Sequence, residues 1–153
     1  MRGVYTVTYH ISDLDVEKTL ILLSAPADKV VEVLSASVTN DDNAVNEQFQ
    51  CTLQRVQTLG SPTGTSATPA KHEEGDQSAG STVLANITAS EPTYAANTEI
   101  GREATSSVGG WYFDPTPEER PTVKPSGTIG LRHLGTLGTG FGAVIRVTFR
   151  EIG

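Results

Sequence analysis

Hydrophobic and polar residues alternate along most of this chain, and a period of two is typical of β-strands. The alternation is plainest near the end of the sequence, where Phe141, Ile145 and Phe149 would face a core while Arg146 would face outward. Thr and Ser are frequent, with 20 and 12 copies, and Thr favours strands and turns over helix interiors. Alternation or a short apolar run predicts strands at 4–12, 18–24, 47–58, 81–88, 98–108, 128–134 and 141–151, of which 98–108 is the most polar.

Residues 29–39 allow two interpretations. Val30, Val31 and Leu34 could share one face of a helix, but the β-branched residues and the alternation of Ser35 and Ser37 with apolar neighbours favour a strand. This strand brings the predicted number to about eight, separated by turns and long polar loops. The pattern predicts an all-β fold, a β-sandwich of jelly-roll type. We find no internal repeat and no linker between two cores, so residues 1–153 are predicted to form a single domain.

Two long polar segments would connect the strands. Residues 59–80 contain several glycines and prolines and almost no large apolar side chain, which predicts a long loop or a loop with a short edge strand inside it. Residues 114–125 contain four prolines and are predicted to be a crossing loop in extended conformation. Its acidic, proline-rich part, from Asp114 to Pro121, is interpreted as a surface arm able to lie across a neighbouring subunit.

Composition and charge argue against several classes of protein. The net charge of −7, with only 11 Lys and Arg, does not suit a chain that binds nucleic acid. No stretch approaches about 18 consecutive apolar residues, so no membrane-spanning helix and no membrane partner are predicted. The first residues lack the apolar core of a signal peptide, and Cys51 is the single cysteine. We therefore expect synthesis and folding in a reducing cytoplasm.

No pattern of residues points to catalysis or to a bound metal ion. His72, Glu73 and Asp76 lie close together in the long loop but lack the spacing of known metal motifs, so a solvated loop of mixed charge is the favoured interpretation. His10 and His133 lie on predicted strands and are interpreted as packed or surface residues. No catalytic residue, metal site or cofactor is predicted, and an enzyme is the least favoured class.

Trp111, Tyr112 and Phe113 form the only aromatic cluster in the sequence. Such a cluster suits a core, a protein interface, in which aromatic residues are enriched, or a platform that stacks sugars. The small number of other aromatic residues favours the core or the interface. The candidate interface residues are therefore Trp111, Tyr112, Phe113, Glu118, Glu119 and Arg120, together with His72 and Glu73 of the long loop.

The order of several short motifs is familiar from one group of proteins. The chain resembles small virion proteins of tailed bacteriophages, the capsid decoration or cement proteins encoded among the head genes. The resemblance runs across most of the chain, and it brings no catalytic residues. The motifs are Lys18-Thr19-Leu20, Ala25-Pro26-Ala27, Val31-Glu32-Val33, Leu53-Gln54-Arg55, residues 63–69, residues 86–93, Pro117-Glu118-Glu119-Arg120-Pro121 and Gly130-Leu131-Arg132.

The resemblance implies a β-sandwich that binds the outer surface of an icosahedral capsid, often as a homotrimer. The partners would be the major capsid protein and further copies of this chain, and the location would be the virion, after synthesis in the bacterial host cytoplasm. Such a protein stabilises the capsid by bridging neighbouring capsid subunits. Two alternatives remain open, namely a tail, neck or head-fibre component, and a carbohydrate-binding module that uses Trp111, Tyr112 and Tyr94.

Overall fold

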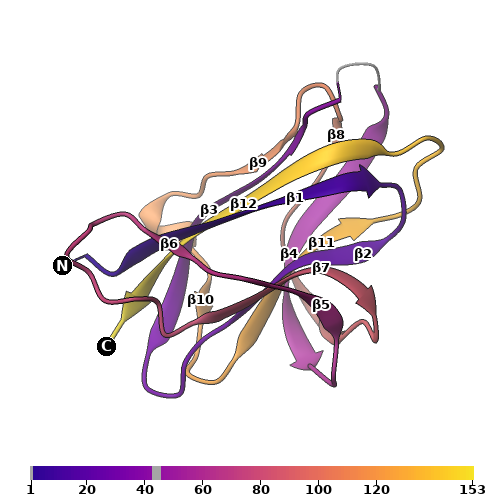
Figure 1. Cartoon of the computed structure of the whole chain (residues 1–153). Coiled ribbons are helices and arrows are strands. Elements are labelled where there is room, and N and C mark those ends of the chain that lie inside the picture. Colours follow the sequence, from indigo (N-terminus) through magenta and orange to yellow (C-terminus); the bar gives the residue numbers. More distant parts are fainter. Residues whose placement is uncertain (1, 43–45) are drawn as a thin grey trace.

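The computed structural model describes residues 2–42 and 46–153, which form two antiparallel sheets packed face to face (Figure 1). The predicted all-β sandwich is confirmed. Apart from strands, the described residues contain one short 3-10 helix, η1 (Pro117–Glu119). Sheet A consists of β1 (Val4–Leu14), β3 (Val30–Asn40), β6 (Ala70–Lys71), β9 (Trp111–Phe113), β10 (Thr122–Val123) and β12 (Phe141–Ile152). Sheet B consists of β2 (Lys18–Ser24), β4 (Gln48–Thr58), β5 (Thr63–Ala67), β7 (Thr82–Ala89), β8 (Thr93–Ser106) and β11 (Thr128–Leu134).

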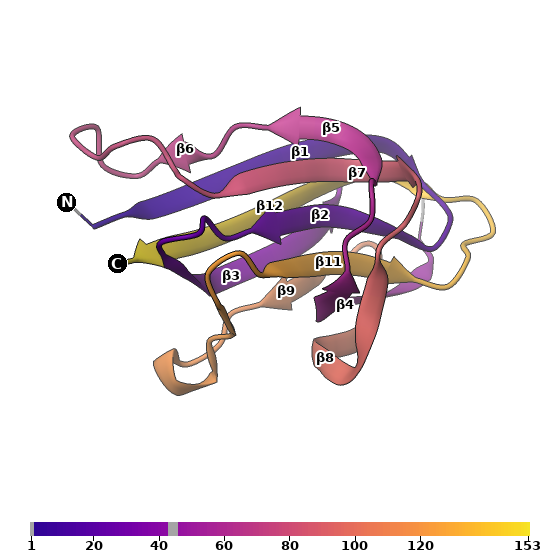
Figure 2. The same ribbon diagram turned by 90° about the horizontal axis from the view of Figure 1, so that it is seen from below.

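The strand order is that of a jelly roll. Sheet A contains the order β1-β12-β3-β9 and sheet B the order β2-β11-β4-β8. The pairs β1 with β12, β2 with β11, β3 with β9 and β4 with β8 are nested, as in a long hairpin rolled into two sheets. Strands β5, β6 and β7 are inserted between β4 and β8, where β6 pairs with β1 and β7 pairs with β2 (Figure 2).

The strands of the roll differ in part from those that the sequence predicts. The bounds of β2 and β11 agree with the prediction, and residues 30–40 form a strand rather than a helix. Strand β9 was expected only as an aromatic cluster, and β8 begins at Thr93, before the start of the predicted strand 98–108. The long loop 59–80 contains β5 and β6, so the second of the two predictions for this segment, a loop with a short edge strand inside it, is correct. Strand β8 lacks a strong apolar pattern because it pairs with β4 alone, at the edge of sheet B.

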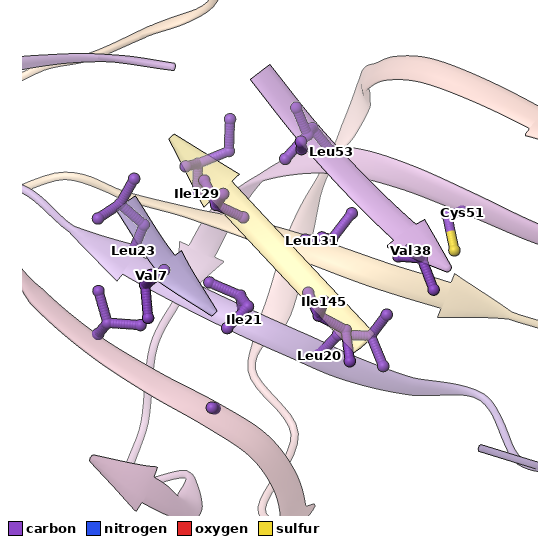
Figure 3. Packing of buried hydrophobic residues seen from close by; sticks show 14 of the residues in the cluster. Val7, Leu20, Ile21, Leu23, Val38, Cys51, Leu53, Ile129, Leu131 and Ile145 are labelled. Atoms are coloured by element: carbon purple, nitrogen blue, oxygen red, sulfur yellow. The ribbon is translucent and has the colours of Figure 1, made fainter. Parts of the chain in front are cut away.

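Hydrophobic side chains from both sheets fill the space between them. Alternate residues of β12, including Phe141, Ile145 and Phe149, are buried as their spacing predicts. Each fully buried side chain of this size contributes about 1.5–3 kcal/mol to folding. Figure 3 shows this packing, in which Val7, Val38 and Ile145 of sheet A lie against Leu20, Ile21, Leu23, Cys51, Leu53, Ile129 and Leu131 of sheet B.

His133 belongs to this core and is fully buried, in keeping with its interpretation as a packed residue. Its ring lies 6.4 Å from that of Phe49, measured between centroids. Burial lowers the pKa of His133, although a hydrogen bond to the carbonyl of Val16 opposes the shift. Nδ1 donates to that carbonyl at 2.8 Å. Burial favours the uncharged ring over the protonated one.

The segment that follows β6 is tied to sheet A, which corrects the view that all its charged residues are solvated. Asp76 is only 4% exposed, and its Oδ2 accepts the Gly3 N–H at 3.0 Å. At the end of the segment, the Glu151 carboxylate accepts both the N–H and the hydroxyl of Ser81, each at 2.7 Å. The same carboxylate accepts a hydrogen bond from Lys29 Nζ at 3.0 Å. These buried acids hold a glycine-rich segment that has little apolar surface of its own.

Candidate interface at the β8–β9 edge

The aromatic cluster lies on β9, which extends the edge of sheet A beyond β3. Because side chains alternate along a strand, Trp111 is 1% exposed while Tyr112 is 63% exposed, and Phe113 is half-buried. The Trp111 indole Nε1 donates to the carbonyl of Gly101 in β8 at 3.1 Å. This bond joins the two sheets, so Tyr112 is presented on a rigid edge.

Phe113 completes the packing at this edge. Its ring stacks on that of Trp111, with centroids 6.3 Å apart and an interplanar angle of 8°. Gly101 also lies against Phe113, where a Cβ atom would stand 2.6 Å from Phe113 Cδ2. The backbone of Gly101 also has φ +64°, a conformation that favours glycine. The edge therefore depends on glycine for both space and backbone conformation.

Gly101→Ala should lower the free energy of unfolding more than Gly60→Ala does. Both glycines have φ +64°, but no atom lies within 4 Å of a Cβ at Gly60. The backbone strain should cost about 1–2 kcal/mol in each variant. The clash with Phe113 should add about 1–3 kcal/mol in Gly101→Ala alone. Urea denaturation of the two variants measures this difference, and equal losses would show that Phe113 does not rest on Gly101.

An open cleft of about 430 Å³ lies beside Tyr112 and Phe113. Its charged residues are all acidic, namely Glu103 of β8, Asp114 after β9 and Glu119 of η1. The Glu119 carboxylate accepts the Thr116 hydroxyl at 3.0 Å, which fixes the turn of η1. An aromatic wall with acidic side chains around it suits contact with a basic surface that carries apolar groups.

The acidic arm, residues 114–121, is anchored at both ends on β3. Strand β9 precedes it, and after it Val123 of β10 pairs with Val31 of β3. The Val33 N–H donates to the carbonyl of Pro121 at 3.0 Å. Between these anchors the arm projects from the body of the sandwich (Figure 2). Its acidic residues, including Glu118, are exposed, so it lies at the surface as predicted.

This edge also includes Arg120 and exposed apolar residues. Arg120 is half-buried, and its Nε has no hydrogen-bond partner among the described residues. Val108, in the turn between β8 and β9, is 67% exposed, which makes Val108 and Tyr112 the two most exposed large hydrophobic residues in the described chain. Val108 and Glu103 were not among the interface residues predicted from the sequence. The only signal for Val108 was its place beside Gly109 and Gly110.

The two predicted interface groups lie at opposite edges of sheet A. His72 and Glu73 follow β6, whereas the aromatic cluster lies on β9, and β1, β12 and β3 separate these strands. His72 Nε2 lies 2.5 Å from the hydroxyl of Thr6. The Glu73 carboxylate accepts the N–H of Arg2 at 3.2 Å. The structure therefore brings six of the eight predicted residues to one edge and places the other two elsewhere.

A sugar platform built from three aromatic rings is not present. Trp111 is buried, so its ring cannot stack on a ligand. Arg132 lies over the ring of Tyr94, with the guanidinium carbon 4.2 Å from the ring centroid. Burial raises the pKa of Tyr94 to about 12, although a hydrogen bond with Thr19 opposes the shift. Of the three rings, only that of Tyr112 is open to a partner.

Comparison with known proteins adds no family assignment. In residues 2–42 and 46–153, no three His, Cys, Asp or Glu side chains are placed to hold a metal ion. The described residues include no helix of the length and apolar character needed to cross a bilayer. No family model, curated protein or solved structure matches the chain.

Proposed function

We propose that this protein is a non-enzymatic virion component that binds the outer surface of a tailed-phage capsid and stabilises it by bridging neighbouring capsid subunits. The observation that best supports this proposal is the β8–β9 edge, where Tyr112 and Val108 are exposed. The hydrogen bond from the buried Trp111 to Gly101 holds this edge in place. Rigid aromatic anchors of this kind are common at the centres of protein interfaces. The jelly roll also agrees, since many viral capsid domains have this fold.

The proposal assigns the β8–β9 edge and the acidic arm to contacts with the capsid or with a second copy of the chain. A stable interface buries about 800 Å² on each partner, so we expect both the edge and the arm to take part in the contact. Bound copies add their binding free energy to the stability of the particle, so each one raises the cost of separating capsid subunits. A homotrimer would place three such edges on neighbouring capsid subunits.

Deleting the gene from its phage should make the particles lose infectivity sooner on heating or osmotic shock. Purified protein should restore resistance, and Tyr112→Ala should restore it poorly because the variant lacks the exposed anchor. Val16→Ala is the matched control, since Val16 is an exposed hydrophobic residue, 43% accessible, outside this edge. Deletion particles as resistant as the parent would overturn the proposal, and equal rescue by both variants would remove Tyr112 from the contact.

The two alternatives make different predictions. A tail, neck or head-fibre component would be located away from the capsid shell by labelling of intact particles. The jelly roll is also found in lectin domains, so a carbohydrate-binding module has support from the fold. With Trp111 buried, such a module would depend on Tyr112 and the carboxylates beside it. Binding on a glycan array that Tyr112→Ala abolishes would favour this alternative.

A further inference from the structure

A charged side chain points into the sandwich where the core ends. Arg55 follows Leu53 by two residues on β4, so it faces the same side as that buried leucine. Its guanidinium bridges the sheets, because Nη1 donates to the carbonyl of Thr122 in β10. Among the described residues, no carboxylate contacts Arg55. Because Arg55 is partly shielded from water, it attracts an anion more strongly than a fully exposed arginine would.

Arg55 lines a cleft of about 480 Å³ together with residues of β3, β10 and the start of β11. The volume is within the range of small-ligand sites. Lys124, an exposed residue of the turn after β10, supplies a second cation. No ion pair of Lys124 occurs in the part of the chain that the structure describes. Both charged groups of the cleft are positive, in a chain whose net charge is −7.

The other walls of this cleft restrict the kind of anion that it suits. Val30, Val56 and Val123 contribute apolar surface, and Thr122 and Thr128 contribute the polar part of the lining. Apolar walls disfavour a strongly hydrated dianion such as phosphate. They suit a single negative charge on an aliphatic stem, whose methylene groups would contact the valines while the carboxylate meets the two cations.

We propose that this cleft, called here the Arg55 cleft, binds a carboxylate carried on a short aliphatic stem. The source is either a free aliphatic acid or a glutamate side chain of a protein partner. The carboxylate would accept hydrogen bonds from the Arg55 guanidinium and the Lys124 ammonium group. This site goes beyond the proposed function, since it lies apart from the cleft beside Tyr112 and does not require a capsid.

Titration of the isotope-labelled protein with two carboxylates, followed by amide NMR, tests the proposal. The probes are sodium valerate and N-acetylglutamate N-methylamide, with 1-pentanol and the glutamine analogue as uncharged controls. We expect saturable shifts at Val56, Lys124, Gly127 and Thr128 with at least one carboxylate and with neither control. Saturation by valerate alone identifies a free acid as the ligand, and saturation by the glutamate derivative alone identifies a protein side chain. Shifts that saturate with neither carboxylate overturn the proposal.

Three variants make the test specific to the cleft. Arg55→Gln and Lys124→Gln should each raise the Kd about tenfold or more, since each removes one charge-assisted hydrogen bond. Arg55→Gln also removes the hydrogen bond to Thr122 and could impair folding. In that case Lys124→Gln alone still tests the proposal. The matched control is Arg146→Gln, which removes an exposed arginine of β12 outside the cleft. Equal weakening by Arg146→Gln would show a general charge effect and would overturn the proposal.

Discussion

Trp111→Ala should lower the free energy of unfolding by about 3–5 kcal/mol, the usual cost of truncating a fully buried large aromatic side chain. Trp111 is 1% exposed and contributes in two ways. Its ring stacks on Phe113, and its Nε1 bridges to Gly101 across the sandwich. Removing the ring leaves a cavity at the edge where the two sheets meet. It also leaves the carbonyl of Gly101 without its donor.

Chemical denaturation of three variants separates these contributions. Trp111→Phe keeps most of the packing and loses the indole N–H, so its loss of stability should be clearly smaller than that of Trp111→Ala. Tyr112→Ala should change the free energy of unfolding by less than about 0.5 kcal/mol, because Tyr112 is 63% exposed. A loss for Tyr112→Ala as large as that for Trp111→Ala would contradict the division of β9 into a buried support and an exposed anchor.

Glu151→Gln should have the second largest effect, a loss of about 3 kcal/mol in the free energy of unfolding. The Glu151 side chain is 2% exposed, and its carboxylate accepts two hydrogen bonds from Ser81 and one from Lys29. Breaking a buried ion pair by removing one partner costs about 3–5 kcal/mol. The lower end applies here, since the Lys29 side chain is 27% exposed and recovers part of its hydration.

The same carboxylate should make stability depend on pH. Burial by itself raises the pKa of Glu151, but the hydrogen bonds from Ser81 and Lys29 outweigh it, and the net shift is downward. A carboxyl group with a lowered pKa in the folded state stabilises the fold fully above its unfolded pKa of about 4.3. This contribution is lost as the pH falls from there through the lowered pKa of the folded state.

Urea denaturation between pH 7 and pH 3 measures both effects of Glu151. The parent protein should lose stability steeply below about pH 4.3, and Glu151→Gln should start lower and show a shallower slope. Glu118→Gln is the matched control, since Glu118 is exposed on the acidic arm. A slope in Glu151→Gln as steep as that of the parent would show that other carboxyl groups account for the acid sensitivity.

The sequence determined those features that depend on residues close together in the chain. Strands β2, β11 and β12 were predictable from their burial. Most of β12 buries one face, which imposes alternation, whereas β2 is buried on both faces, which imposes an apolar run, and β11 is buried on both faces at its centre. The surface position of the acidic arm was predictable too, because the three acidic residues between 114 and 125 are unfavourable in a core and its four prolines cannot join the interior of a sheet. Together these local signals suffice for an all-β sandwich.

Only the tertiary structure decided which distant segments meet. Strand β9 exists because β3 offers it a free edge, and three aromatic residues alone do not specify a pairing partner. The separation of His72 from Trp111 follows from strand order, which one sequence does not encode locally. The Arg55 cleft combines residues from both sheets that lie far apart in the chain. The cleft beside Tyr112 also joins both sheets, but it does so within residues 100–119. Arg55 continues the alternation of β4, but its lack of a counter-ion appears only once the two sheets are packed together.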